Sequence, residues 1–137
     1  MAYAATYTVT VSTKQGDGRR RWLVVITETE CANTSEFAVA PSVCSGYPLP
    51  SSGTITRYSA VKTAGTAATL RPILSRTTAP ASTQVGYIGQ QSAAAASVHD
   101  GTSTRYDNLT TLYGRSTPDA GADNTIVTEI TIVEGHF

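Results

Sequence analysis

Hydrophobic and polar residues alternate most clearly in the first thirty residues of the chain. Residues 7–13 place one tyrosine and two valines on one face of an extended strand, and threonines and a serine on the other. A β-branched run that contains the only tryptophan, Trp22, follows at residues 21–28. Two glycines flank an aspartate at residues 15–18, where a turn costs least. The pattern predicts a β-hairpin over residues 3–30, with Trp22 and Ile26 facing the core.

Further strands are predicted along the rest of the chain, separated by glycine- and proline-rich turns. They fall at residues 36–40, 53–61, 69–76, 83–89 and 125–134. Pro72 places the third of these at a sheet edge or on a bulge. Residues 105–114 fit either a helix or a strand, and Ala93–Ala96 predict one helical turn. The chain is therefore predicted to be all-β, a single β-sandwich or jelly-roll domain over residues 1–137, with seven or eight antiparallel strands and a flexible N-terminal arm over about residues 1–6.

The composition indicates a polar surface made of hydroxyl groups rather than of charges. Charged residues make up 15% of the chain, whereas threonine occurs 23 times. A formal net charge of zero argues against nucleic acid as a partner, because nucleic-acid binding needs a basic surface. No apolar run approaches the length of a membrane span, and the N-terminus lacks the pattern of a secretory signal. We therefore expect no membrane partner and synthesis in the cytoplasm, where Cys31 and Cys44 would be free thiols rather than a disulfide.

Candidate catalytic and metal-binding residues are few. His99 and His136 lie far apart without the spacing of a zinc site, and no nucleophile or phosphate-loop motif is present. Glu28 and Glu30 would share one strand face, as a glycosidase pair could, but two charges at this spacing more often lie on a solvated face. Asp119 and its neighbours are typical of a turn. These patterns predict no enzyme activity, no metal and no cofactor.

Two short segments carry the residues typical of protein contacts. Arg19–Arg21 is the only charge run, and a partner contact and a solvated hairpin base explain it about equally well. The segment from Tyr47 to Pro50 is an extended connection with an aromatic residue and a leucine. A lid over the core of the domain is the favoured interpretation of that segment, and a partner contact is the alternative.

As a whole, this threonine- and alanine-rich β chain resembles the head-decoration, or cement, proteins of tailed bacteriophages, their jelly-roll members in particular. The phrases that carry the resemblance are residues 65–72 (GTAATLRP) and 112–116 (LYGRS). The resemblance implies a structural protein on the exterior of the virion, synthesised in the host cytoplasm. It implies that the major capsid protein is the partner, and that the chain forms homodimers or homotrimers and staples neighbouring capsid subunits.

Contacts with the shell are expected where a compact domain has little use for apolar or arginine side chains. We expect them at the N-terminal arm beside the arginines and at the loop and tail; the residues are Met1, Ala2, Tyr3, Arg19, Arg20, Arg21, Tyr47, Leu49, His136 and Phe137. One alternative is a carbohydrate-binding jelly roll that uses Trp22 or the seven tyrosines as stacking faces. The other is a phage tail or connector component.

Overall fold

The computed structural model describes residues 2–12, 18–44, 46–78, 85–92 and 97–135. In these ranges the chain forms eleven β-strands and one short 3₁₀ turn, so the prediction of an all-β domain is confirmed. The elements are β1 (Ala4–Ser12), β2 (Arg21–Cys31), β3 (Phe37–Val39), η1 (Pro41–Val43), β4 (Gly53–Ala64), β5 (Thr69–Leu70), β6 (Ile73–Ser75), β7 (Gly86–Tyr87), β8 (Gln91–Ser92), β9 (Ser97–Tyr106), β10 (Leu112–Arg115) and β11 (Asn124–Glu134).

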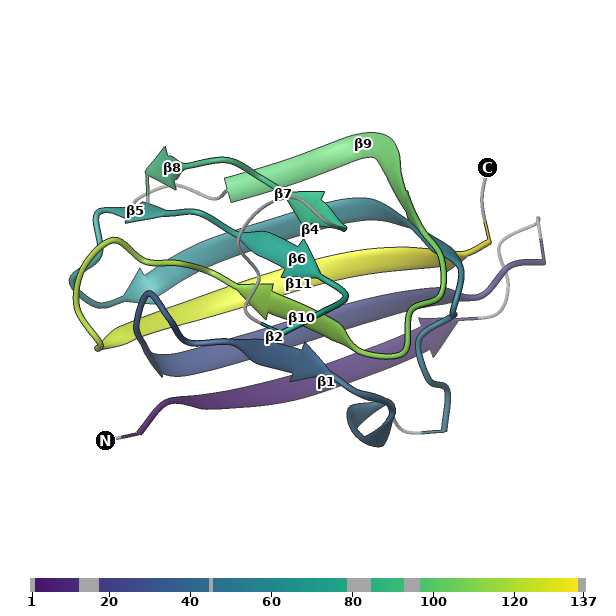
Figure 1. Ribbon diagram of the computed structural model, residues 1–137, viewed down its shortest axis with the longest axis horizontal. Coiled ribbons are helices and arrows are strands. Elements are labelled where there is room, and N and C mark those ends of the chain that lie inside the picture. The colour runs from purple at the N-terminus through teal and green to yellow at the C-terminus, as the bar shows by residue number, and fades with distance from the viewer. Residues whose placement is uncertain (1, 13–17, 45, 79–84, 93–96, 136–137) are drawn as a thin grey trace.

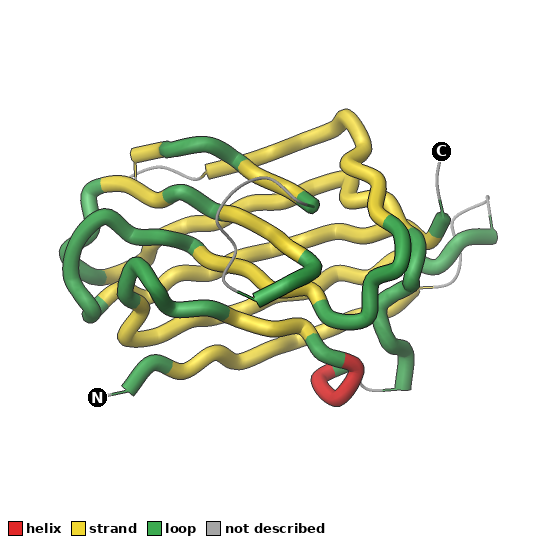
Figure 2. Tube along the Cα trace, viewed as in Figure 1, coloured by secondary structure: helices red, strands yellow, loops and turns green. Residues whose placement is uncertain are grey.

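The strands form two facing antiparallel sheets (Figures 1 and 2). The larger sheet has the order β1-β2-β11-β4-β9 and the smaller β3-β10-β6-β7, while β5 and β8 pair separately. Strand β2 pairs with β11, β3 with β10, β4 with β9 and β6 with β7. Strands from the first half of the chain therefore pair with later strands in reverse order, so that each pair is nested inside the one before it in sequence. This nesting is the jelly-roll arrangement, to which β1 adds a fifth strand beside β2.

The predicted hairpin is confirmed as β1 and β2, which pair without interruption from Ala4 opposite Thr29 to Ser12 opposite Arg21. Residues 13–17 of its turn lie outside the described ranges. The flexible arm predicted over residues 1–6 is wrong from Ala4 onward, because Ala4 already belongs to the paired strand. The alternation of exposed and half-buried residues begins at Ala4, before the first large apolar residue of the strand, because alanine and threonine occupy its first positions.

The core lies between the two sheets and is filled by alternate residues of the long strands. Trp22, Val24 and Ile26 of β2 are buried, as the pattern predicted, and pack with Ile130 and Ile132 of β11. The smaller sheet covers them with buried residues that include Phe37, Leu74 and Leu112. Because one face of each strand enters this core, the register of the sheets is fixed by the sequence pattern.

Several predictions of individual elements need correction. The strand predicted over residues 69–76 is two strands in different sheets, because Pro72 separates β5 from β6 and cannot donate to a ladder. Of the two alternatives for residues 105–114, the helix is wrong: residues 105–106 end β9, residues 107–111 connect the strands, and residues 112–114 belong to the strand β10. The number of strands exceeds the predicted seven or eight because of this division and because β8 and β9 were not recognised. The helical turn expected at residues 93–96 lies outside the described residues.

Within the described ranges, no helix has the length and apolar character needed to cross a membrane. Both cysteines are buried and free, in agreement with the prediction of two thiols. Three of the polar residues predicted to lie in turns, Asp119, Asp123 and Asn124, connect β10 to β11 and begin β11. They bind the backbone of the β4–β5 connection rather than solvent alone.

Candidate functional site: an arginine–tyrosine rim

The charge run predicted as a possible contact lies at one end of the sandwich. Arg21 begins β2 opposite the last residue of β1, and it also pairs with Val133 near the end of β11. The connection that contains Tyr47 reaches the same end, which is the end that carries the C-terminus in Figure 1. We call the surface formed by Arg19, Arg20, Arg21, Tyr47 and Glu134 the arginine–tyrosine rim.

Residues distant in sequence hold the rim in one geometry. The guanidinium of Arg20 lies 5.2 Å from the centroid of the Tyr47 ring, within the range of a cation–π interaction. The Arg20 backbone N–H donates to Glu134 Oε1 at 3.2 Å, and the Glu134 N–H donates to the Arg20 carbonyl at 3.0 Å. Arg19 Nη1 donates to the Glu134 carbonyl at 3.0 Å. The end of β11 therefore fixes the backbone that presents the arginines.

Tyr47 is held by its backbone and leaves its ring on the surface. Its carbonyl accepts a hydrogen bond from Trp22 Nε1 at 3.0 Å, while 46% of the residue is exposed. Leu49, two residues later, is buried in the core. The loop is therefore a lid over the core, as the favoured interpretation held. Leu49 belongs to that lid, and its expected place in a partner contact is wrong.

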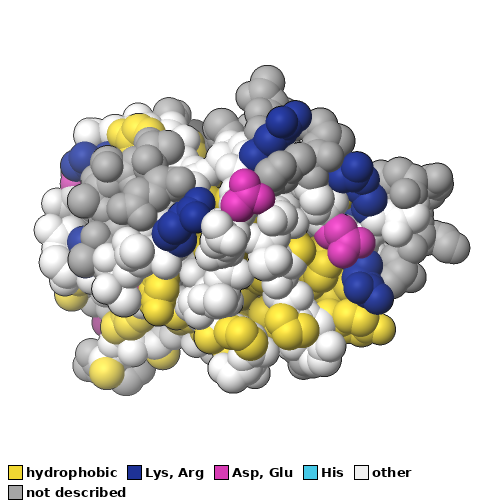
Figure 3. Space-filling view, turned by 45° about the vertical axis from the view of Figure 1, so that its right-hand side comes forward, with side chains coloured by type: hydrophobic (Ala, Val, Ile, Leu, Met, Phe, Trp, Pro, Cys, Tyr) yellow, Lys and Arg dark blue, Asp and Glu magenta, His cyan; other side chains and the backbone are white. Residues whose placement is uncertain are grey.

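An apolar area continues from the rim onto the outer face of the larger sheet. Leu23 is 41% exposed there and lies beside a shallow hollow of about 240 Å³ lined by Thr10, Ser12, Arg21, Trp22, Leu23 and Thr131. Figure 3, in which this end of the molecule comes forward, shows basic and acidic side chains next to hydrophobic ones. Trp22 itself is only 2% exposed, so it cannot serve as the stacking face of a sugar site.

The N-terminal residues lie at the opposite end, so the expected arm does not lie beside the arginines. Ala4 pairs with Thr29, whereas Arg21 pairs with Ser12. Nine residues of strand separate the two ends of β1, a distance on the order of 30 Å. Tyr3, predicted as a shell contact, instead donates from its hydroxyl to Glu28. Ala2 is exposed near it, and Met1, His136 and Phe137 lie outside the described residues.

A buried carboxyl group is the functional feature that sequence reasoning missed. Glu28 was expected on a solvated face, but its side chain is completely buried between the sheets. It accepts hydrogen bonds from Ser116 Oγ at 2.6 Å, Tyr3 Oη at 2.7 Å and Cys31 Sγ at 3.5 Å. Burial raises the pKa of Glu28, and the three donors only partly oppose that rise. Through these hydrogen bonds, Glu28 connects β2 with Tyr3 near the N-terminus and with Ser116 directly after β10.

The signal for this burial was present in the strand pattern. Trp22, Val24 and Ile26 point inward, and Glu28 occupies the next inward position of the same strand. Glu30 does not continue the alternation, because its φ of 52° interrupts the extended backbone. The two carboxyl groups therefore have different surroundings and do not form the pair that a glycosidase would need.

No group of three or more His, Cys, Asp or Glu side chains within the described part of the chain is placed to hold a metal ion. Comparisons of the chain with protein-family models, with curated proteins and with solved structures gave no match.

Proposed function

We propose that this chain is a structural virion protein that binds the outer surface of an assembled phage capsid and staples neighbouring major-capsid subunits. The observation that carries the proposal is the arginine–tyrosine rim, an exposed and rigid group of arginine and aromatic side chains at one end of a jelly roll. Jelly rolls are common among viral shell domains, which is an analogy of fold and supports the proposal only in that sense.

The composition of the rim is that of a protein interface. Arginine and tyrosine are enriched at the centres of interfaces, where an aromatic ring supplies apolar area and a guanidinium binds carboxylates in two-point geometry. Arg20 already lies over the Tyr47 ring, and its backbone is held by Glu134. A rim ordered before contact loses little conformational freedom on binding, so more of the contact energy appears as affinity.

Self-association is part of this proposal, and β1 is the element that suits it. Strand β1 forms an edge of the larger sheet, so one side of its backbone has no neighbouring strand in that sheet. Its nine residues, AATYTVTVS, include no charged residue and no proline. Edge strands normally carry such residues because they prevent pairing with another chain. A second copy that pairs antiparallel with β1 would form a two-fold dimer with one continuous sheet.

A dimer of this kind explains how modest contacts could reinforce a shell. The rim lies at one end of each copy, so a two-fold pair would present two rims. Each rim would bind one capsid subunit, and the second binding event would be intramolecular once the first had formed. Many symmetric copies would then link neighbouring subunits without any chemical reaction.

The capsid contact is tested by co-sedimentation of purified variants with heads that lack this protein. Tyr47→Ala and Arg20→Ala are expected to lower affinity by about 2 kcal/mol each, roughly 30-fold in Kd, because they remove the aromatic and cationic centres of the rim. Arg71→Ala removes an exposed arginine at the opposite end of the molecule and is the matched control. Equal occupancy of the heads by all three variants and the unaltered chain would contradict the role of the rim.

The oligomer is tested separately by light scattering after size-exclusion chromatography. Thr8→Lys places a charge on β1, and Thr131→Lys places one on β11, in the interior of the same sheet. We expect the first substitution to convert dimers to monomers and the second to leave them intact. A chain that is monomeric at all concentrations would contradict pairing through β1.

A tail or connector component is the alternative within the same class of virion protein. The rim would serve that role equally well, and the location of the protein in the virion distinguishes the two. Labelling of intact particles with an antibody to this chain would place it on the head under our proposal and on the tail or neck under the alternative.

A further inference from the structure

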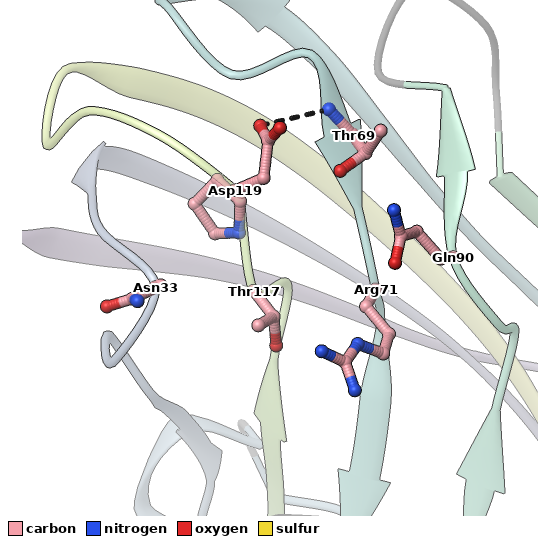
Figure 4. Close-up of a pocket in the computed structure, with 7 residues that line it drawn as sticks. Asn33, Thr69, Arg71, Gln90, Thr117 and Asp119 are labelled. Carbon is pink, nitrogen blue, oxygen red and sulfur yellow. Dashed lines mark hydrogen bonds between the residues drawn. The ribbon is translucent and has the colours of Figure 1, made fainter.

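A second hollow lies at the end of the sandwich opposite the rim and has no part in the proposed capsid contact. It measures about 190 Å³ and is formed by the β2–β3 loop, the β5–β6 connection, the β7–β8 loop and the β10–β11 loop. Its lining residues, drawn as sticks in Figure 4, are Asn33, Thr69, Arg71, Gln90, Thr117, Pro118 and Asp119. Six of these seven residues carry a polar side chain.

Several of these polar groups are available to a ligand. The side chains of Arg71, Asn33 and Gln90 line the hollow and are exposed. In Figure 4 the Arg71 side chain is turned toward Thr117. The hydroxyl oxygen of Thr117 is buried and lacks a protein partner. A buried hydroxyl without a partner is costly, and rotation of this side chain toward the hollow would let a ligand or water satisfy it.

The backbone at Thr117 is held in an unusual conformation. Its φ is 47°, a value that β-branched residues rarely adopt. The neighbours on both sides, Ser116 and Pro118, are buried, and Ser116 also donates a hydrogen bond to Glu28. Conformations of this kind persist where the surroundings impose them, and they gather at binding sites. The fold therefore maintains Thr117 at the hollow despite an unfavourable backbone.

Asp119 supplies an acceptor at the same hollow. Its Oδ1 accepts from the backbone N–H groups of Ala68 at 2.7 Å and Thr69 at 3.1 Å. The N–H groups of Thr69 and Ala68 lower the pKa of Asp119, so the carboxylate stays charged at neutral pH. A carboxylate has about four acceptor positions, so it can also accept from a ligand. Its charge balances that of Arg71, which makes the hollow neutral overall.

We propose that this hollow binds a single neutral monosaccharide unit. Arg71 and the two amides donate, Asp119 and the amide oxygens accept, and the Thr117 hydroxyl can do both. Adjacent sugar hydroxyls require this mixture of donors and acceptors, whereas a simple anion or an apolar molecule would leave half of the groups unused. The volume of about 190 Å³ is below that of sites for drug-sized ligands and suits one sugar ring. The ring of Pro118 supplies the apolar part of the wall.

Sugar binding at this hollow is independent of the proposed capsid contact at the rim. The rim and the hollow lie at opposite ends of the eleven-residue strand β2, on the order of 30 Å apart. A protein that binds a shell by one end and a sugar by the other would present its sugar site away from the shell. Loss of either activity can be measured while the other remains.

The test is a titration of the full chain, labelled with ¹⁵N, followed by two-dimensional NMR. The probes are the methyl glycosides of glucose, galactose and mannose, with sodium acetate as a simple anion. We expect at least one glycoside to shift the amide signals of Arg71, Thr117 and Asp119 with saturation at millimolar concentration, and acetate to leave them unchanged. No shift with any glycoside, or shifts with acetate alone, would overturn the proposal.

Two variants and one control complete the experiment. Thr117→Val keeps the branched shape and removes the hydroxyl, and Arg71→Ala removes the guanidinium. Each is expected to weaken glycoside binding at least tenfold while the spectrum remains that of the folded protein. Arg20→Ala at the rim should bind the glycoside like the unaltered chain. Binding by Thr117→Val equal to that of the unaltered chain would contradict the assigned role of the hydroxyl.

Discussion

Replacement of Glu28 by glutamine should make the protein less stable than the unaltered chain in acid and more stable than the unaltered chain at higher pH. The carboxyl group is completely buried, and its three hydrogen-bond donors, Ser116, Tyr3 and Cys31, are neutral groups. Burial raises its pKa in the folded state above the ordinary value of 4.5. The folded protein therefore binds this proton more tightly than the unfolded chain does.

The sign of the pH effect follows from this difference in proton binding. Below about pH 4.5 the group is protonated in both states, and its full contribution to stability is present. As the pH rises through the folded-state pKa, that contribution is lost, because the unfolded chain ionises freely and the folded chain ionises at a cost. At a pH above the folded-state pKa, each unit by which the pKa is raised corresponds to about 1.4 kcal/mol of lost stability.

Glutamine has nearly the same shape as Glu28 and remains neutral at every pH. Its amide can accept from one of the two hydroxyl groups, but its NH₂ group faces the other, which costs about one hydrogen bond, roughly 1 kcal/mol. Glu28→Gln should therefore be less stable by about 1 kcal/mol at pH 4, or about 4 °C in Tm. As the pH rises toward the folded-state pKa of Glu28, the difference in stability should shrink. At still higher pH it should reverse, because only the unaltered chain bears the cost of a buried charge.

The assay is urea unfolding from pH 4 to pH 8, followed by the fluorescence of Trp22, the only tryptophan, which is buried in the core. At each pH the variant is compared with the unaltered chain, so contributions from other titrating groups cancel. Glu129→Gln, on an exposed position of β11, is the matched control and should follow the unaltered chain throughout. A difference between Glu28→Gln and the unaltered chain that is the same at pH 4 and pH 8 would refute the reasoning.

Three further predictions concern the core and its borders. Gly114→Ala should destabilise the protein by about 1–3 kcal/mol in urea unfolding, because a Cβ there would overlap the buried ring of Phe37; an unchanged midpoint would contradict this packing. Asn124→Ala should cost about 3 kcal/mol, since the buried amide makes three hydrogen bonds to backbone groups, and a loss below about 1 kcal/mol would show that water replaces them. Cys31 and Cys44 should react with a thiol reagent only as fast as the protein opens, because both are buried and burial raises the pKa of each; rapid reaction in native buffer would contradict this.

Much of the fold could be predicted because one face of each long strand is buried. Alternation identified β1, β2 and β11 and the inward positions of Trp22 and Ile26. The shortest strands have two or three residues, fewer than a period of two needs to be recognised, so the pattern could not separate β5 from β6 or reveal β8. The nested pairing of the strands arises from contacts between distant segments and has no local signature.

The candidate site was predicted in part, for a physical reason. The arginine run and Tyr47 stood out because their side chains are unusual for the surface of a small domain, and the structure brings them together at one rim. The N-terminal arm was assigned to the same end because the direction of β1 was not followed through its pairing with β2. Glu28 was missed because a carboxylate is normally solvated, although its position in the strand indicated the core. The polar hollow combines residues from four connections, and only the folded chain brings them together.

The proposed place of this protein on the exterior of the capsid can be tested on purified viral particles. Quantitative mass spectrometry of purified viral heads, with and without brief protease treatment of intact particles, tests it most directly. We expect the chain to be present in a fixed ratio to the major capsid protein and to be cleaved while the major capsid protein is spared. Its absence from purified heads, or full protection of the chain inside intact particles, would contradict the claim.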